Sequence, residues 1–108
     1  MNGFRIVVSG RVQGVHFRTM VKTFADGKKL CGRVRNCADS SLEIVVNGSH
    51  EKVQTLISWL RKSPGISRVE RVVVEEIAFD ERFGDFVIVR DNFLLWDQQR
   101  AMGNFVQQ

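Results

Sequence analysis

The 108-residue chain contains no tyrosine, a single proline and only two cysteines, and each scarcity narrows what the protein can be. A composition that is 44% hydrophobic and 26% charged with one proline is typical of a globular domain rather than a disordered segment. The length suits one domain. Uninterrupted apolar runs are too short to cross a membrane. The first residues also lack the basic start and long apolar core of a secretory signal peptide.

The two cysteines, Cys31 and Cys37, are predicted to be free thiols. If both lie on one strand, at about 3.3 Å per residue, they are roughly 20 Å apart, whereas a disulfide requires Cα atoms within about 7 Å. Free thiols are typical of a reducing compartment, so we expect a cytoplasmic protein. His16 and His50 are isolated in the sequence and, with two distant cysteines, do not predict a metal site. We therefore expect no metal and no other cofactor.

Hydrophobic periodicity predicts five strands and two helices. Apolar patterns typical of strands cover residues 4–12, 31–37, 42–48, 66–79 and 86–89. Apolar residues at helical spacing predict one helix over residues 17–27 and a second between its N-cap, Ser49, and the Ser-Pro-Gly at 63–65. The valine run within 66–79 indicates a bulge or burial on both sides.

This order of elements, βαββαβ plus a short final strand, predicts a ferredoxin-like sandwich of the α+β class. Right-handed crossovers place both helices on one face of an antiparallel sheet. The fold class alone specifies no function.

Residues 1–90 are predicted to form the domain, and residues 91–108 a C-terminal extension. The extension is too apolar for a simple disordered tail. The face of the sheet without helices is expected to carry Val7, Val45 and Val87, which is apolar for a solvated face. We expect the extension to form a short amphipathic helix that covers this face or pairs two chains, so the protein is a monomer or a tail-mediated dimer. An extension without a structural role is the alternative.

The stretch GRVQGVHFR at residues 10–18 joins the first strand to the first helix. Backbone N–H groups at a helix start can form an anion-binding concavity, to which the helix dipole adds partial positive charge. Gly14 permits the positive φ that such a concavity requires, and Arg18 adds a guanidinium fork that matches phosphate. The stretch lacks the motifs of Walker and dinucleotide-binding loops. An ordinary strand-to-helix turn with a surface arginine is the alternative.

Asn36 is predicted to share a face of its strand with Gly32 and Val34. An amide beside a valine is unusual there. The side chain either caps the following turn or orients a ligand or a water.

GRVQGVHFR and GRVRNCADSSLE together resemble the two signatures of the acylphosphatase family, Gly-x-Val-Gln-Gly-Val-x-Phe-Arg and Gly-x-Val-x-Asn-x-x-Asp-Gly. The segment WLRKSPGISRVERVVVEEI also resembles the corresponding part of that family. The resemblance covers roughly residues 4–90. It implies metal-independent hydrolysis of acyl phosphates to a carboxylate and inorganic phosphate.

Carried over by position, the resemblance implies that Arg18 binds the phosphate and that Asn36 positions the attacking water. The backbone N–H groups that surround the phosphate would come from the loop residues Gln13, Gly14, Val15, His16, Phe17 and Arg18. An acyl phosphate has a good carboxylate leaving group, so the enzyme needs mainly positioning and charge stabilisation. Inorganic phosphate or sulfate is expected to bind in the same loop. With no obvious base, the proton of the water passes to the substrate phosphate in our hypothesis.

The sequence departs from the family pattern at a few positions. Ser40 replaces a turn glycine, and a serine in the left-handed region costs about 1 kcal/mol. Lys28 and Lys29 stand where leucine and glycine are common, which shifts the expected end of the first helix.

His16 lies at a variable position. It is either a side chain at the mouth of the site or a direct phosphate contact, and a direct contact predicts weaker binding as the pH rises through about 5 to 8. Cys37 is expected to be a quiet thiol.

Three other functions have to be weighed. A non-catalytic phosphate or carboxylate sensor of the same family would share both motifs. An RNA-recognition domain shares the strand order, but its stacking platform requires exposed aromatic residues on the central strands, and RFGDFVIV falls on the last strand. A net charge of +4 favours anionic partners but is weak evidence for nucleic acid. Larger maturation enzymes also carry this domain, and the lack of further domains argues against them. We expect a small-molecule acyl phosphate as the partner, with neither membrane nor nucleic acid.

Overall fold

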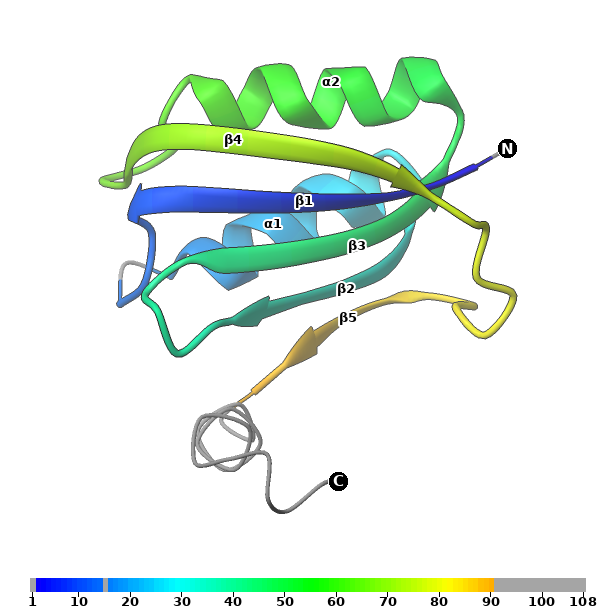
Figure 1. Ribbon diagram of the computed structural model, residues 1–108, viewed down its shortest axis with the longest axis horizontal. Coiled ribbons are helices and arrows are strands. Elements are labelled where there is room, and N and C mark those ends of the chain that lie inside the picture. The colour runs from blue at the N-terminus through cyan, green and yellow to red at the C-terminus, as the bar shows by residue number, and fades with distance from the viewer. Residues whose placement is uncertain (1, 15, 91–108) are drawn as a thin grey trace.

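A computed structural model describes residues 2–14 and 16–90, which form two helices packed against one sheet (Figure 1). The expected helix in the C-terminal extension and the expected role of Val15 lie outside the described residues. The elements are β1 (Asn2–Arg11), α1 (Phe17–Gly27), β2 (Cys31–Asn36), β3 (Leu42–Gly48), α2 (His50–Arg61), β4 (Arg68–Ile77) and β5 (Phe86–Val89).

The sheet has the strand order β4-β1-β3-β2-β5. Neighbouring strands from β4 to β2 pair antiparallel, as expected, and both helices lie on one face (Figure 1). The ferredoxin-like sandwich is therefore confirmed. The final strand adds a feature that the pattern did not indicate, because β5 pairs parallel to β2 at the edge of the sheet. The parallel direction places the end of β5 beside the end of β2, where Asn36 lies.

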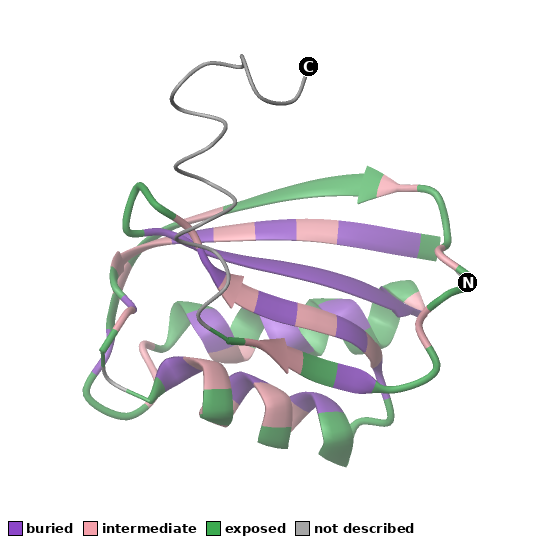
Figure 2. Ribbon diagram, turned by 90° about the horizontal axis from the view of Figure 1, so that it is seen from below, coloured by how far each residue is buried: buried purple, intermediate pink, exposed green. Residues whose placement is uncertain are grey.

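The core lies between the helices and the central strands. Alternate residues of β1, namely Phe4, Ile6 and Val8, are buried against the helices, and β3 is buried along its whole length (Figure 2). Burial of each such side chain contributes about 1.5–3 kcal/mol relative to exposure. The ring of Trp59 stacks on Phe24 at a centroid distance of 4.5 Å, so the tryptophan packs α2 against α1.

Local signals at the helix ends agree with the structure. The Ser49 hydroxyl accepts a hydrogen bond from the Lys52 N–H at 3.2 Å, which confirms the predicted N-cap of α2. Gly27 is the last residue of α1, as expected. The left-handed residue beyond it is Lys29, with φ 57°, in place of a glycine.

The valine run of β4 contains no segment buried on both sides, and that alternative is wrong. A bulge does precede the run, because Ser9 pairs with Arg71 whereas Gly10 pairs with Val69, so one residue of β4 is left over. The extra residue changes which side of β4 the odd- and even-numbered residues face. Val69 before the bulge and Val72 after it therefore both pack against the core. A side chain at Gly10 would place its Cβ 2.1 Å from the Arg68 carbonyl oxygen, so the close approach of the strands there requires glycine.

Candidate active site

The loop between β1 and α1 turns through left-handed backbone conformations. Gly14 has φ 73°, as the sequence predicts, and His16, directly before α1, has φ 59°. The carbonyl oxygen of His16 accepts the Met20 N–H at 3.2 Å and so begins the helix. The exposed His16 side chain makes no capping hydrogen bond to α1. The N-terminal end of α1, which carries a partial positive charge, therefore has no side-chain cap from His16.

The side chain of Gln13 holds this loop against the turn that follows β2. Its Nε2 donates hydrogen bonds to the carbonyl oxygens of Cys37 and Ser41, each at 2.9 Å. The Gln13 amide thus contacts protein backbone, and any contribution to an anion would come from its backbone N–H, as the sequence reasoning had it.

Arg18 lies in the first turn of α1 and is half-buried. Its Nη1 donates a hydrogen bond to the carbonyl oxygen of Val89 on β5 at 3.1 Å. This bond uses one of the five N–H donors of a guanidinium and fixes the direction of the side chain. The arginine that the sequence singles out is therefore held by the last strand of the sheet.

Asn36 is the last residue of β2 and is only 7% exposed. It shares the helix-facing side of the strand with Val34, as predicted. Its Oδ1 is buried, and no donor among the described residues reaches it. Leaving a buried acceptor without a partner costs about 1–3 kcal/mol. The Oδ1 is therefore available for a bound water or ligand.

The loop after β1, the first turn of α1 and the ends of β2 and β5 together enclose a cavity of about 240 Å³. Among the residues that the structure describes, those that line it are Val12, Gly14, His16, Phe17, Arg18, Thr19, Asn36 and Arg90. Five of the predicted site residues are thus brought together: Gly14, His16, Phe17, Arg18 and Asn36. Gln13 lies beside the cavity. The Phe17 side chain belongs to the core, so only its backbone is suited to contact a ligand.

Sequence reasoning missed two polar residues of the lining. Thr19 follows Arg18 in the first turn of α1, and Arg90 directly follows β5. No motif marks Arg90. It reaches the cavity because β5 runs parallel to β2, a pairing that hydrophobic periodicity does not reveal.

The turn after β2 is stabilised by its own polar groups. Hydrogen bonds from the Ser41 hydroxyl and N–H, at 2.6 and 3.0 Å, lower the pKa of the Asp39 carboxyl. Ser40 has φ 76° and so adopts the left-handed conformation considered from the sequence. Burial raises the pKa of the Cys37 thiol, and a hydrogen bond with Ser41 opposes the shift only in part. A raised pKa keeps the thiol protonated at neutral pH, as a quiet cysteine requires.

Within residues 2–14 and 16–90, no cluster of three or more His, Cys, Asp and Glu side chains is arranged to hold a metal ion. Neither helix in this part of the chain has the length and apolar character needed to cross a membrane.

Residues 4–88 match the sequence model of the acylphosphatase family. The chain belongs to the acylphosphatase family. Within it, the acylphosphatase of Methylococcus capsulatus is 37% identical over 91 residues, which are 84% of this chain and 99% of that protein. The crystal structure of acylphosphatase from Bacillus subtilis has a TM-score of 0.78 at 37% identity and covers 82% of this chain and 99% of that one. The resemblance stated from the two motifs is therefore confirmed.

The same fold also occurs as part of a larger protein. A crystal structure of full-length HypF, in a phosphate- and nucleotide-bound form, matches 82% of this chain at 31% identity with a TM-score of 0.75. The match covers only 12% of that chain. The family's domain thus occurs both as a small protein and inside a long one.

Proposed function

We propose that the protein hydrolyses acyl phosphates to a carboxylate and inorganic phosphate in the cavity between α1 and the ends of β2 and β5. Family membership supports the reaction class. The observation that carries the mechanism is that Asn36, whose buried Oδ1 has no partner among residues 2–14 and 16–90, lines the same cavity as Arg18. An acceptor does not suit a bound anion, whose oxygens need hydrogen-bond donors, whereas it can accept a hydrogen bond from an attacking water.

The phosphoryl group binds at the N-terminal end of α1. The backbone N–H groups of the loop and of the first helical turn donate to its oxygens, and the helix end adds about half a positive charge. Arg18 supplies the matching guanidinium from a direction fixed by its bond to Val89. These donors stabilise the negative charge on the equatorial oxygens as the bond to the leaving group lengthens.

Asn36 orients the water. Its Oδ1 accepts one O–H of the water, so that a lone pair of the water oxygen points at phosphorus on the side opposite the leaving carboxylate. The new O–P bond forms as the bond between phosphorus and the acyl oxygen breaks. The proton of the water passes to a phosphoryl oxygen, because an amide cannot take it. The products are a carboxylate and inorganic phosphate, and the phosphate occupies the same donors as the substrate.

The test is hydrolysis of benzoyl phosphate in excess chelator by the wild type, Arg18→Ala and Asn36→Ala. We expect turnover that resists the chelator and that both substitutions nearly abolish. Arg18→Ala should also weaken the binding of inorganic phosphate, measured by titration calorimetry, whereas Asn36→Ala should leave that binding almost unchanged. Arg61→Ala, at an exposed arginine in the last turn of α2, is the matched control and should behave as wild type.

Two outcomes would contradict the proposal in different ways. Phosphate binding without turnover by the wild type would favour the non-catalytic sensor. Turnover that survives in Asn36→Ala would leave the reaction intact and remove the water-positioning role. Circular dichroism of each variant separates loss of function from loss of fold.

A reducing, cytoplasmic location is part of the same proposal. Cys31 and Cys37 are both free thiols, which are typical of reducing compartments. Cell fractionation tests this location, and recovery of the protein outside the cytoplasm would overturn it.

A further inference from the structure

The face of the sheet opposite the helices, called the open face below, carries valines from four strands. Val7 on β1 pairs with Val73 on β4, Val45 on β3 lies between Arg5 and Arg33, and Val87 on β5 pairs with Arg33. Val73 and Val87 are 45% and 47% exposed. A sheet face in water normally presents polar side chains. Here exposed valines lie on both edge strands, β4 and β5, so a segment that crosses the face would shield both from water.

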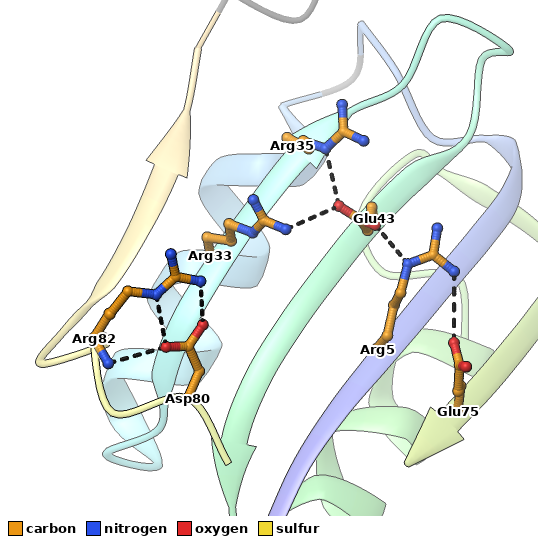
Figure 3. A network of polar contacts seen from close by, with 7 residues as sticks. All are labelled: Arg5, Arg33, Arg35, Glu43, Glu75, Asp80 and Arg82. Carbon is orange, nitrogen blue, oxygen red and sulfur yellow. Dashed lines mark hydrogen bonds and ion pairs between the residues drawn. The ribbon is translucent and has the colours of Figure 1, made fainter. Parts of the chain in front are cut away.

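The open face also carries three arginines gathered around one glutamate. The Glu43 side chain is only 6% exposed and contacts Arg5 Nε at 2.6 Å, Arg35 Nε at 2.9 Å and Arg33 Nη2 at 3.5 Å (Figure 3). Burial raises the pKa of Glu43, but hydrogen bonds from Arg35 and Arg5 and the nearby positive charges outweigh it, so the net pKa is lowered. Glu43 is therefore ionised at neutral pH.

Glu75 is a further carboxylate beside this cluster, 3.9 Å from Arg5. The Nε of Arg33 is buried and has no acceptor among the described residues. A partner that supplies both apolar side chains and hydrogen-bond acceptors would satisfy this surface.

The C-terminal extension has that chemistry and begins at the right place. Residues 91–108 carry seven large apolar side chains, together with two aspartates and one arginine. They follow Arg90 at the end of β5, and Val89 pairs with Arg35 of the open face. Eighteen residues can span up to about 60 Å, whereas the five strands are roughly 20 Å across at about 4.8 Å per neighbour.

We propose that residues 91–108 cover the open face of their own chain. Their apolar side chains pack on Val7, Val73 and Val87, and their carboxylate and amide oxygens accept from the arginine cluster, Arg33 included. The interaction surface is independent of the phosphate site and goes beyond the proposed hydrolysis.

The first test uses Trp96, one of the two tryptophans, as a reporter in the full-length chain with Trp59→Phe. We expect Trp96 to emit at shorter wavelength than free tryptophan and to be quenched by acrylamide several-fold more slowly. Val73→Asp with Val87→Ser on the open face should abolish both effects. The matched control is Ile66→Asp with Val74→Ser, two exposed positions away from the open face, which should leave them unchanged.

Quenching of Trp96 at the rate of free tryptophan, or a signal indifferent to the substitutions on the open face, would overturn the proposal. A second measurement needs no substitution. With valine methyl groups labelled in the native chain, nuclear Overhauser effects should connect the Trp96 indole with methyl groups of Val7, Val73 or Val87. In a mixture of labelled and unlabelled chains, effects that arise between chains would overturn the intramolecular cover in favour of a dimer.

Discussion

The amide nitrogen of Gln13 lies 2.9 Å from the carbonyl oxygen of Cys37 and joins the two halves of the candidate site. Gln13 belongs to the loop that leads into Arg18, and Cys37 is the neighbour of Asn36. The same nitrogen also donates to the Ser41 carbonyl oxygen. A displacement of the loop relative to the end of β2 would break both bonds, so Gln13 fixes the distance between the proposed anion site and the proposed water site.

Replacement of Gln13 by alanine is expected to lower stability and substrate affinity together. Two hydrogen bonds at about 0.5–1.5 kcal/mol each, lost from partly buried carbonyl groups, predict about 1–3 kcal/mol of unfolding free energy. The loosened loop should raise KM for benzoyl phosphate more than it lowers kcat. Urea unfolding and steady-state kinetics measure the two effects. Gln54→Ala, on the exposed side of α2, is the control, and equal behaviour of the two variants would contradict the role assigned to Gln13.

Arg90 is expected to assist binding without being essential. It lines the cavity from an exposed position, where a single charge contributes less than about 1 kcal/mol. We therefore expect Arg90→Ala to raise KM about two- to fivefold with little change in kcat. The difference from wild type should shrink as salt is added, because exposed charges are screened. Arg82→Ala removes another exposed arginine, one outside the cavity lining, and should leave KM unchanged.

Ser40→Gly is expected to stabilise the protein by about 1 kcal/mol, because glycine tolerates a left-handed backbone without the steric cost that serine bears. Ser63, with φ 53°, is the matched control. Its hydroxyl accepts a hydrogen bond from the Val69 N–H at 2.9 Å, so Ser63→Gly should gain less or lose stability. Thermal unfolding of the two variants distinguishes them, and a destabilised Ser40→Gly would show that the serine side chain has a favourable role.

Glu43 is expected to make the protein sensitive to acid. Its folded pKa lies below the ordinary value of 4.5, so its ionised form favours the folded state. The contribution is fully present above that ordinary value and is lost as the pH falls through the lowered folded pKa. Glu43→Gln should be less stable than wild type at pH 7, by about 1–3 kcal/mol, and its stability should change less with acid. Urea unfolding from about pH 7 to 3 tests this, with the exposed Glu81→Gln as control. Parallel curves for Glu43→Gln and wild type would contradict it.

Much of the molecule could be predicted because its signals are local. Alternation along β1 and helical spacing along α1 follow from which side of each element is buried, and the left-handed φ of Gly14 follows from the demands of a tight loop. The end of β2 was correctly linked to the loop by resemblance, although periodicity alone could not bring Asn36 and Arg18 together.

Contacts between residues that are far apart in the sequence were not predictable in the same way. The parallel pairing of β5 depends on which edge of the sheet is free once the other strands have paired, and only that pairing puts Arg90 in the cavity. The sequence placed Gln13 in the anion loop through its backbone N–H and predicted no contact for its side chain. That side chain binds backbone carbonyl groups, which every residue carries. No residue type in β2 or in the turn after it therefore reveals these hydrogen bonds.

The bond between Arg18 and Val89 joins residues 71 positions apart. During synthesis from the N-terminus, Arg18, Asn36 and the whole loop leave the ribosome well before Val89 does. The guanidinium gains this anchor only when β5 has been made and has paired beside β2. A nascent chain that ends before Phe86 would carry both proposed catalytic residues while Arg18 still lacks the carbonyl that aims it. Completion of the last strand thus marks the moment in biosynthesis at which the site can acquire its final geometry.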